Sequence, residues 1–279
     1  MPVEKPPLES PDSSAARQRH IQYRRRVFLT IGLSIAGFYA IILGYHFLTP
    51  QPSKAASSSV LEQCRELCLQ YGLIPTGHVA NDAKAYLNSA RTEKLSAPLR
   101  EILSDPHFVV AESREHALLK RPALDFQLSN HKGETVSLAE LNREGPVVLV
   151  FYMGYDCSHC VAQLFGLNED LAHFRELGAR IVAISADPPE ETAAKFAEYG
   201  AFDFIVLSDP GNQVAQAYGV YRPETNEIPA DLKHGTFLIS PTGKVIFATY
   251  GYKPFLDNKS LLYMLSEFSP LKAAVKTTP

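Results

Sequence analysis

The chain has 279 residues, with 27 lysines and arginines against 30 aspartates and glutamates, and its formal net charge is −3. This length suits one domain of ordinary size with additional segments, and it leaves little room for a second large domain. No long basic run follows the first quarter of the sequence, which argues against a nucleic-acid partner because phosphate binding needs clustered cations. The four cysteines form two close pairs, which favours redox or metal chemistry.

The amino-terminal region combines a polar tail with an apolar segment. Residues 1–26 are rich in proline, serine and charge, which predicts a disordered cytoplasmic tail. Residues 27–48 carry no charged side chain and, at about 1.5 Å per residue, are long enough to cross a hydrocarbon layer of about 30 Å. Arginines at 24–26 precede this segment, so the positive-inside rule keeps the N-terminus in the cytoplasm. We expect a single anchor in membrane lipid and an extracytoplasmic domain, which is periplasmic in a Gram-negative cell.

Two other interpretations of the apolar segment stay open. Residues 53–55 have the small-x-small pattern of a cleavage site, so the segment could be a cleaved signal peptide, although its apolar length favours an anchor. Residues 24–29, three arginines followed by Val-Phe-Leu, also resemble a twin-arginine export signal. Both alternatives still place the rest of the chain outside the cytoplasm.

Residues 49–120 are predicted to form an extracytoplasmic helical segment with its own cysteine pair. Cys64 and Cys68 lie one turn apart in a short amphipathic helix that ends at Gly72. They are either two small buried side chains that pack the helix onto the main domain, or a second dithiol that exchanges electrons with the first. The sequence leaves both interpretations open.

From residue 121 to residue 268, short β-rich runs alternate with amphipathic helices. The predicted strands are Ala123–Leu128, Thr135–Leu138, Pro146–Tyr152, Arg180–Ala186, Phe204–Ser208, Gly235–Ser240 and Lys244–Tyr250. The predicted helices are Val161–Leu177, Pro189–Tyr199, Gly211–Tyr218 and Asp257–Phe268. This alternation requires crossover connections, so we expect an α/β domain of thioredoxin-like fold, with helices flanking a mixed central sheet that is parallel at its centre. Residues 269–279 are predicted to be a disordered tail.

The motif Cys157-Ser158-His159-Cys160 follows the buried strand and opens the next helix. A helix N-terminus stabilises a thiolate, and two intervening residues allow the two sulfur atoms to form a reversible disulfide. His159 adds positive charge when it is protonated. Structural zinc needs two further ligands at suitable spacing, and haem attachment needs a histidine where Val161 stands. We therefore predict a catalytic dithiol that works without a cofactor or a metal.

Several segments of the domain carry a resemblance to a known family. They are PALDF at 122–126, VVLVFYMGYDCSHC at 147–160, VAISADPPEETAAKFAEYG at 182–200, LSDPGNQVAQAYGV at 207–220 and GTFLISPTGKV at 235–245. Through them, residues 121–268 resemble the redoxin branch of the thioredoxin superfamily, also called the alkyl-hydroperoxide-reductase/thiol-specific-antioxidant family. The resemblance implies a thiol-dependent enzyme that reduces hydroperoxides or exchanges disulfides. Its partners would be a thiol electron donor or a client protein.

The motif also departs from the family pattern. An ungapped alignment places the peroxidatic cysteine at Cys160, the preceding hydroxyl residue at Cys157 and the family proline at Met153. The position of the peroxidase arginine, which in thioredoxin-like reductases holds a cis-proline, is occupied by His234. The resemblance therefore leaves two reactions open, and either Cys157 or Cys160 can be the nucleophile.

Two further side chains are candidates for the site. His234 precedes a strand whose start should face the cysteines, so we include it in the catalytic set with Cys157 and Cys160. Two cysteines and a histidine also resemble the copper site of Sco-type proteins, which gives the alternative of a copper-binding assembly protein. Arg222, in the preceding loop, is either a group that polarises a substrate oxygen or a solvated loop residue.

Overall fold

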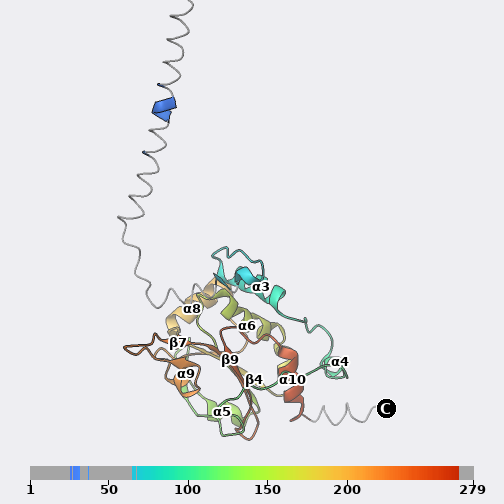
Figure 1. Cartoon of the computed structure of the whole chain (residues 1–279). Helices are drawn as coiled ribbons and strands as arrows, with labels where there is room; N and C mark the ends of the chain where they lie inside the picture. Colours follow the sequence, from blue (N-terminus) through green and yellow to red (C-terminus); the bar gives the residue numbers. More distant parts are fainter. Residues whose placement is uncertain (1–25, 27, 32–36, 38–64, 67, 270–279) are drawn as a thin grey trace, which may run out of the picture. The chain divides into compact units, whose positions relative to one another are not determined.

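The computed structural model describes residues 26, 28–31, 37, 65–66 and 68–269, and the account below is confined to them (Figure 1). Most of the predicted anchor at 27–48, most of both predicted tails and Cys64 lie outside these residues. No helix within the described ranges is long and apolar enough to span a membrane. The chain divides into two compact units, Met1–Ala55 and Ala56–Pro279, and the fold belongs to the second.

A seven-stranded mixed sheet forms the centre of the second unit (Figure 1). Its strands are β1 (Gln127–Asn130), β2 (Thr135–Ser137), β3 (Val147–Phe151), β4 (Arg180–Ser185), β5 (Ile205–Ser208), β8 (His234–Ile239) and β9 (Val245–Gly251). The order across the sheet is β2-β1-β5-β4-β3-β8-β9. Strands β3, β4 and β5 are parallel, whereas β3 and β8, and β8 and β9, are antiparallel. The predicted α/β domain with a parallel centre is confirmed.

Helices cover both faces of this sheet. They are α3 (Val79–Ala90), α4 (Leu99–Ile102), α5 (Leu138–Arg143), α6 (Ser158–Glu169), α7 (Leu171–Glu176), α8 (Pro189–Tyr199), α9 (Gln213–Ala217) and α10 (Asn258–Ser266). Alternate residues of a strand point to opposite faces. In β3, Val148 and Val150 therefore pack with side chains of α7 and α10, while Leu149 and Phe151 pack with those of α5 and α9. Because β3 is buried on both faces, the strand that leads into the cysteine motif has a fixed position.

Several elements differ from the prediction. The first strand, expected at Ala123–Leu128, begins only at Gln127 and runs to Asn130. The helix expected at 161–177 is two helices, α6 and α7, which meet at Asp170. The carboxylate of Asp170 accepts a hydrogen bond from Asn258 of α10 at 2.8 Å, a tertiary contact that fixes this break. The strand expected to reach Leu138 ends at Ser137, whose hydroxyl accepts a hydrogen bond from the backbone of Glu140 and begins α5.

The segment 221–233, expected to be a loop, contains a small ladder. Strand β6 (Tyr221–Arg222) pairs antiparallel with β7 (Asp231–Leu232). The side chain of Arg222 is exposed there. This position agrees with the interpretation of Arg222 as a solvated residue.

Candidate active site

The cysteine motif lies at the corner between β3 and α6. Cys157 has extended backbone angles and is the N-cap of α6, so the helix begins at Ser158. Its carbonyl accepts hydrogen bonds from the backbone N–H groups of Cys160 and Val161, at 3.0 and 3.1 Å. Cys157 and Cys160 are joined by a disulfide. The motif therefore opens the helix as predicted, and its two cysteines form a disulfide.

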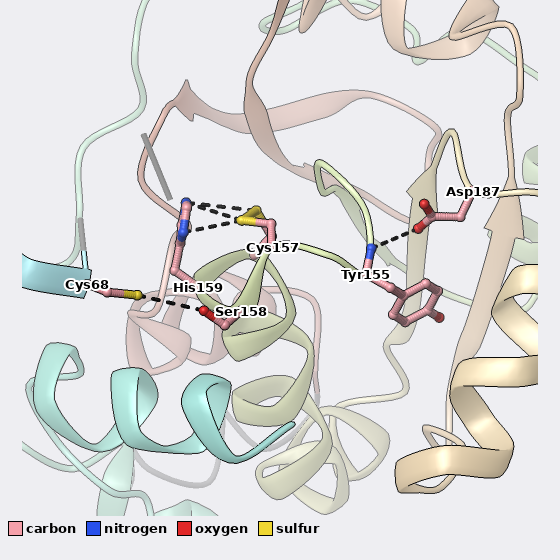
Figure 2. Close-up of a disulfide and its surroundings, with 7 residues drawn as sticks. Cys68, Tyr155, Cys157, Ser158, His159 and Asp187 are labelled. Carbon is pink, nitrogen blue, oxygen red and sulfur yellow. Dashed lines mark hydrogen bonds between the residues drawn. A yellow bond between two sulfur atoms is a disulfide. The ribbon is translucent and has the colours of Figure 1, made fainter. Parts of the chain in front are cut away.

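The disulfide is buried beneath the segment that precedes the domain. Cys157 is 4% exposed and Cys160 is fully buried. Both belong to an apolar cluster that includes Cys68 and, from α3, Tyr86. Figure 2 shows the sulfur of Cys68 directed at Ser158, in the first turn of α6. A substrate or an electron donor must therefore reach the sulfur atoms past this cover.

His159 contacts both sulfur atoms. Its Nδ1 lies 3.2 Å from the Sγ of Cys157, and its Nε2 lies 3.8 Å from the Sγ of Cys160 (Figure 2). Burial lowers the pKa of His159 to about 4, and a hydrogen bond with the backbone of Tyr252 only partly opposes this shift. In the disulfide form the ring of His159 is therefore neutral near neutral pH and does not carry the positive charge considered for its protonated state. A neutral ring next to two sulfur atoms can instead exchange a proton with a thiol.

His234 lies against His159, as expected for a residue that precedes the strand facing the motif. The two ring centroids are 5.6 Å apart. His234 is 2% exposed, and neither of its ring nitrogens has a hydrogen-bond partner among the described residues. Burial, and secondarily His159, hold the pKa of His234 well below its usual value. A buried polar group without a partner is uncommon and calls for an explanation.

Three side chains at the corner could together hold a metal ion. The ligand atoms of Cys157, His159 and Cys160 all lie within 4.8 Å of one another. Two thiolates and an imidazole suit a soft cation such as copper(I), provided that the disulfide is first reduced. The copper alternative named His234 as the histidine, but the structure places His159 closer to the sulfur atoms.

A buried carboxyl group just after β4 holds the loop that precedes the cysteine motif. Asp187, just after β4, accepts a hydrogen bond from the backbone of Tyr155 at 3.1 Å (Figure 2). It accepts a second hydrogen bond from the hydroxyl of Ser185 at 2.9 Å. Burial raises its pKa to about 6. Gly154 has a φ of +117°, and a Cβ there would lie 2.9 Å from the carboxylate. Asp187 is thus a positioning residue for the loop before Cys157, which the sequence analysis missed.

The domain that contains this corner is similar to known proteins. Residues 119–248, which include both cysteines and His234, match the AhpC/TSA family. Peroxiredoxin Bcp of Escherichia coli is 31% identical over 145 residues, which are 51% of this chain and 91% of that protein. Thiol-disulfide oxidoreductase ResA of Halalkalibacterium halodurans is 31% identical over 121 residues, or 43% of this chain and 66% of that protein. The crystal structure of peroxidoxin BcpB from Mycobacterium tuberculosis is 29% identical, covers 57% of this chain and 98% of its own, and superposes with a TM-score of 0.48.

Proposed function

Because the chain belongs to the AhpC/TSA family, we propose that its redox centre is the Cys157–Cys160 pair, which reduces hydroperoxides or exchanges disulfides. The chain is an enzyme with a thiol-dependent redox function, like its peroxiredoxin and thiol-disulfide oxidoreductase relatives. The observation that supports the choice of Cys157 and Cys160 as the redox centre is their disulfide at the N-terminus of α6. The two sulfur atoms that can form this disulfide lie at a helix N-terminus, where a thiolate is stabilised.

The reaction follows from the two sulfur atoms. In the reduced enzyme, one thiolate attacks an oxygen of a hydroperoxide or a sulfur of a disulfide. The product is a sulfenic acid with release of an alcohol or water, or a mixed disulfide with release of a thiolate. The second cysteine then attacks the first sulfur, releasing water or the second thiol and closing the Cys157–Cys160 disulfide. The substrate thereby gains two electrons from the enzyme. An external thiol donor must later return two electrons to the Cys157–Cys160 disulfide.

We assign the attack to Cys157. It is the N-cap of α6, it retains a small exposed fraction while Cys160 has none, and its Sγ makes the shorter contact with His159. The neutral ring of His159 can accept the thiol proton as the attack begins. Cys160, one turn further into the helix, then resolves the intermediate.

Trapping tests this assignment. Cys160→Ser in the full chain should accumulate a mixed disulfide at Cys157 with a model protein disulfide, because the resolving thiol is missing. Cys157→Ser is the matched control and should accumulate none. Trapping by Cys157→Ser alone would reverse the order of the two cysteines, and trapping by neither would contradict disulfide exchange.

Copper binding is a second candidate function, favoured by one observation. The ring of His234, whose nitrogens have no hydrogen-bond partner among the described residues, lies 5.6 Å from the ring of His159, which in turn contacts both sulfur atoms. The reduced chain should then bind copper(I) at one ion per chain, and either His159→Ala or His234→Ala should weaken that binding. Titration of the reduced chain, followed by ultraviolet absorbance of the copper–thiolate bonds, measures both effects. The absence of binding would remove this candidate.

We also propose that residues 27–48 anchor the enzyme and hold the redox domain outside the cytoplasm. The proposal rests on the uncharged apolar run and on the arginines that precede it. Intact mass of the protein recovered from membranes tests it. A full-length mass supports the anchor, whereas loss of all residues before Ala56 would show that the segment is a cleaved signal.

A further inference from the structure

A third sulfur atom lies beside the redox pair. Cys68 is 2% exposed and belongs to the same apolar cluster as Cys157 and Cys160. Its Sγ lies 3.7 Å from the hydroxyl of Ser158, the residue that follows Cys157 in the chain (Figure 2). The fold has brought Cys68 into contact with a motif that lies 90 residues further along the chain, and the dithiol reaction does not use its sulfur atom.

The backbone and a row of rings fix Cys68 at this place. Its carbonyl accepts hydrogen bonds from the backbone N–H groups of Tyr71 and Leu73, at 3.1 and 3.0 Å. The ring of Tyr71 packs edge-on against Tyr86 of α3, with centroids 5.1 Å apart. Tyr86 in turn lies 5.7 Å from the ring of His159. The segment that carries Cys68 is thus attached directly to the catalytic corner.

The burial of the redox disulfide limits how an external donor can reach it, and Cys68 lies in the segment that covers it. An external donor must attack a sulfur atom, yet Cys160 is fully buried and Cys157 is 4% exposed. The neighbours of Cys68 are much more open, since Leu69 is 54% and Tyr71 is 36% exposed. A Cys68–Cys157 disulfide therefore places one of its two sulfur atoms in a segment whose neighbouring side chains are exposed, while Cys68 itself is 2% exposed.

We propose that Cys68 is an internal exchange partner of the Cys157–Cys160 disulfide, a proposal that rests on the redox function proposed for that pair. The thiolate of Cys68 attacks the Sγ of Cys157, and a Cys68–Cys157 disulfide forms. The Cys157–Cys160 bond breaks, and its electron pair leaves with Cys160. The proton lost by Cys68 ends on Cys160, so the exchange needs no external oxidant or reductant.

The geometry sets one requirement for this step. A disulfide needs Cα atoms within about 4.4–6.8 Å of each other and side chains that point together. The Cys68 segment must therefore close on Cys157 as the bond forms. This shift has to break the contact between the Cys68 sulfur and Ser158 and to loosen the packing of Tyr71 against Tyr86.

The first experiment isolates the two sulfur atoms. The full chain carrying Cys64→Ser and Cys160→Ser retains only Cys68 and Cys157, and it is treated with one equivalent of the thiol oxidant diamide. We expect the monomer to lose the mass of two hydrogen atoms and to yield a peptide that links Cys68 to Cys157. The matched control, Cys64→Ser with Cys157→Ser, should give no such intramolecular link. A folded Cys64→Ser/Cys160→Ser protein that forms only intermolecular dimers would overturn the proposal.

A second measurement follows the exchange with the redox pair intact. The oxidised Cys64→Ser protein has one free thiol, which is on Cys68 before exchange and on Cys160 after it. Prolonged labelling with a maleimide, at pH 8, should modify Cys160 as well as Cys68, and labelling confined to Cys68 would contradict the exchange. Both measurements are independent of any substrate, so their failure leaves the proposed redox function standing. Failure of substrate trapping at Cys157 would count against that function instead.

Discussion

Replacing His159 with glutamine should change how the stability of the protein depends on pH. Glutamine has nearly the size of histidine and keeps a donor for the backbone of Tyr252, but it does not titrate. The pKa of His159 is about 4 in the folded protein, against 6.5 as its ordinary value. Between these two values the unfolded chain binds a proton that the folded protein excludes.

The sign and size of the effect follow from this difference. Because the unfolded state binds more protons, the free energy of unfolding falls as the pH is lowered from about 7 to about 4. A difference of roughly 2.5 pKa units corresponds to about 3 kcal/mol. The stability advantage of the native protein over His159→Gln should therefore shrink by about 3 kcal/mol across this range. Asp187 titrates in both proteins and cancels in the comparison, whereas the contribution of His159 to the lowered pKa of His234 is lost in the variant.

Urea unfolding of the oxidised proteins at pH 4, 5, 6 and 7 measures this difference. Acid conditions suppress disulfide exchange, so the Cys157–Cys160 bond stays intact in both states. A stability difference that stays constant between pH 4 and pH 7 would refute the burial of a neutral His159 against the disulfide. A difference that grows as the pH falls would refute the direction of the pKa shift.

Three further predictions concern residues around the cysteine motif and their contribution to the stability of the protein. The pKa of Asp187 is raised, so its ionisation destabilises the fold as the pH rises from about 4 to about 6. The stability of the native protein relative to Asp187→Asn should fall by about 3 kcal/mol over that range in urea unfolding. Gly154→Ala should cost about 1–3 kcal/mol more than Gly133→Ala, because both have positive φ but only Gly154 faces the carboxylate, and urea midpoints compare them. Thr236→Val, which removes the acceptor of the 2.8 Å hydrogen bond from Gln163, should cost about 1–3 kcal/mol by the same measurement, and an unchanged midpoint would contradict it.

Much of the fold could be predicted because the pattern of the sequence is local. The apolar run of β3 and the glycine after α8 mark their elements without tertiary information. The break at Asp170 could not be foreseen, because it depends on Asn258, 88 residues away. The helix α5 was missed although its signal was present, since Ser137 and Glu140 have the spacing of a capping box.

The features of the site that depend on residue spacing could be predicted from the sequence. The features that depend on tertiary packing could not. The two cysteines and the start of α6 follow from the motif, and the approach of His234 follows from the fold. The neutral state of His159 depends on burial, which the motif does not reveal. Asp187 could have been found, because the carboxyl ends of the adjacent parallel strands β3 and β4 meet at one edge. The contact between Cys68 and Ser158 spans 90 residues and has no local signal.

The most direct test of the central claim is the thiol state of Cys157 and Cys160 after contact with substrate. The reduced full chain is mixed with one equivalent of hydrogen peroxide or, separately, of a model protein disulfide, then alkylated and mapped by mass spectrometry. We predict that at least one of these substrates converts the pair to the Cys157–Cys160 disulfide. If both cysteines of a folded protein remain free for alkylation after both treatments, the pair is not the redox centre of this enzyme.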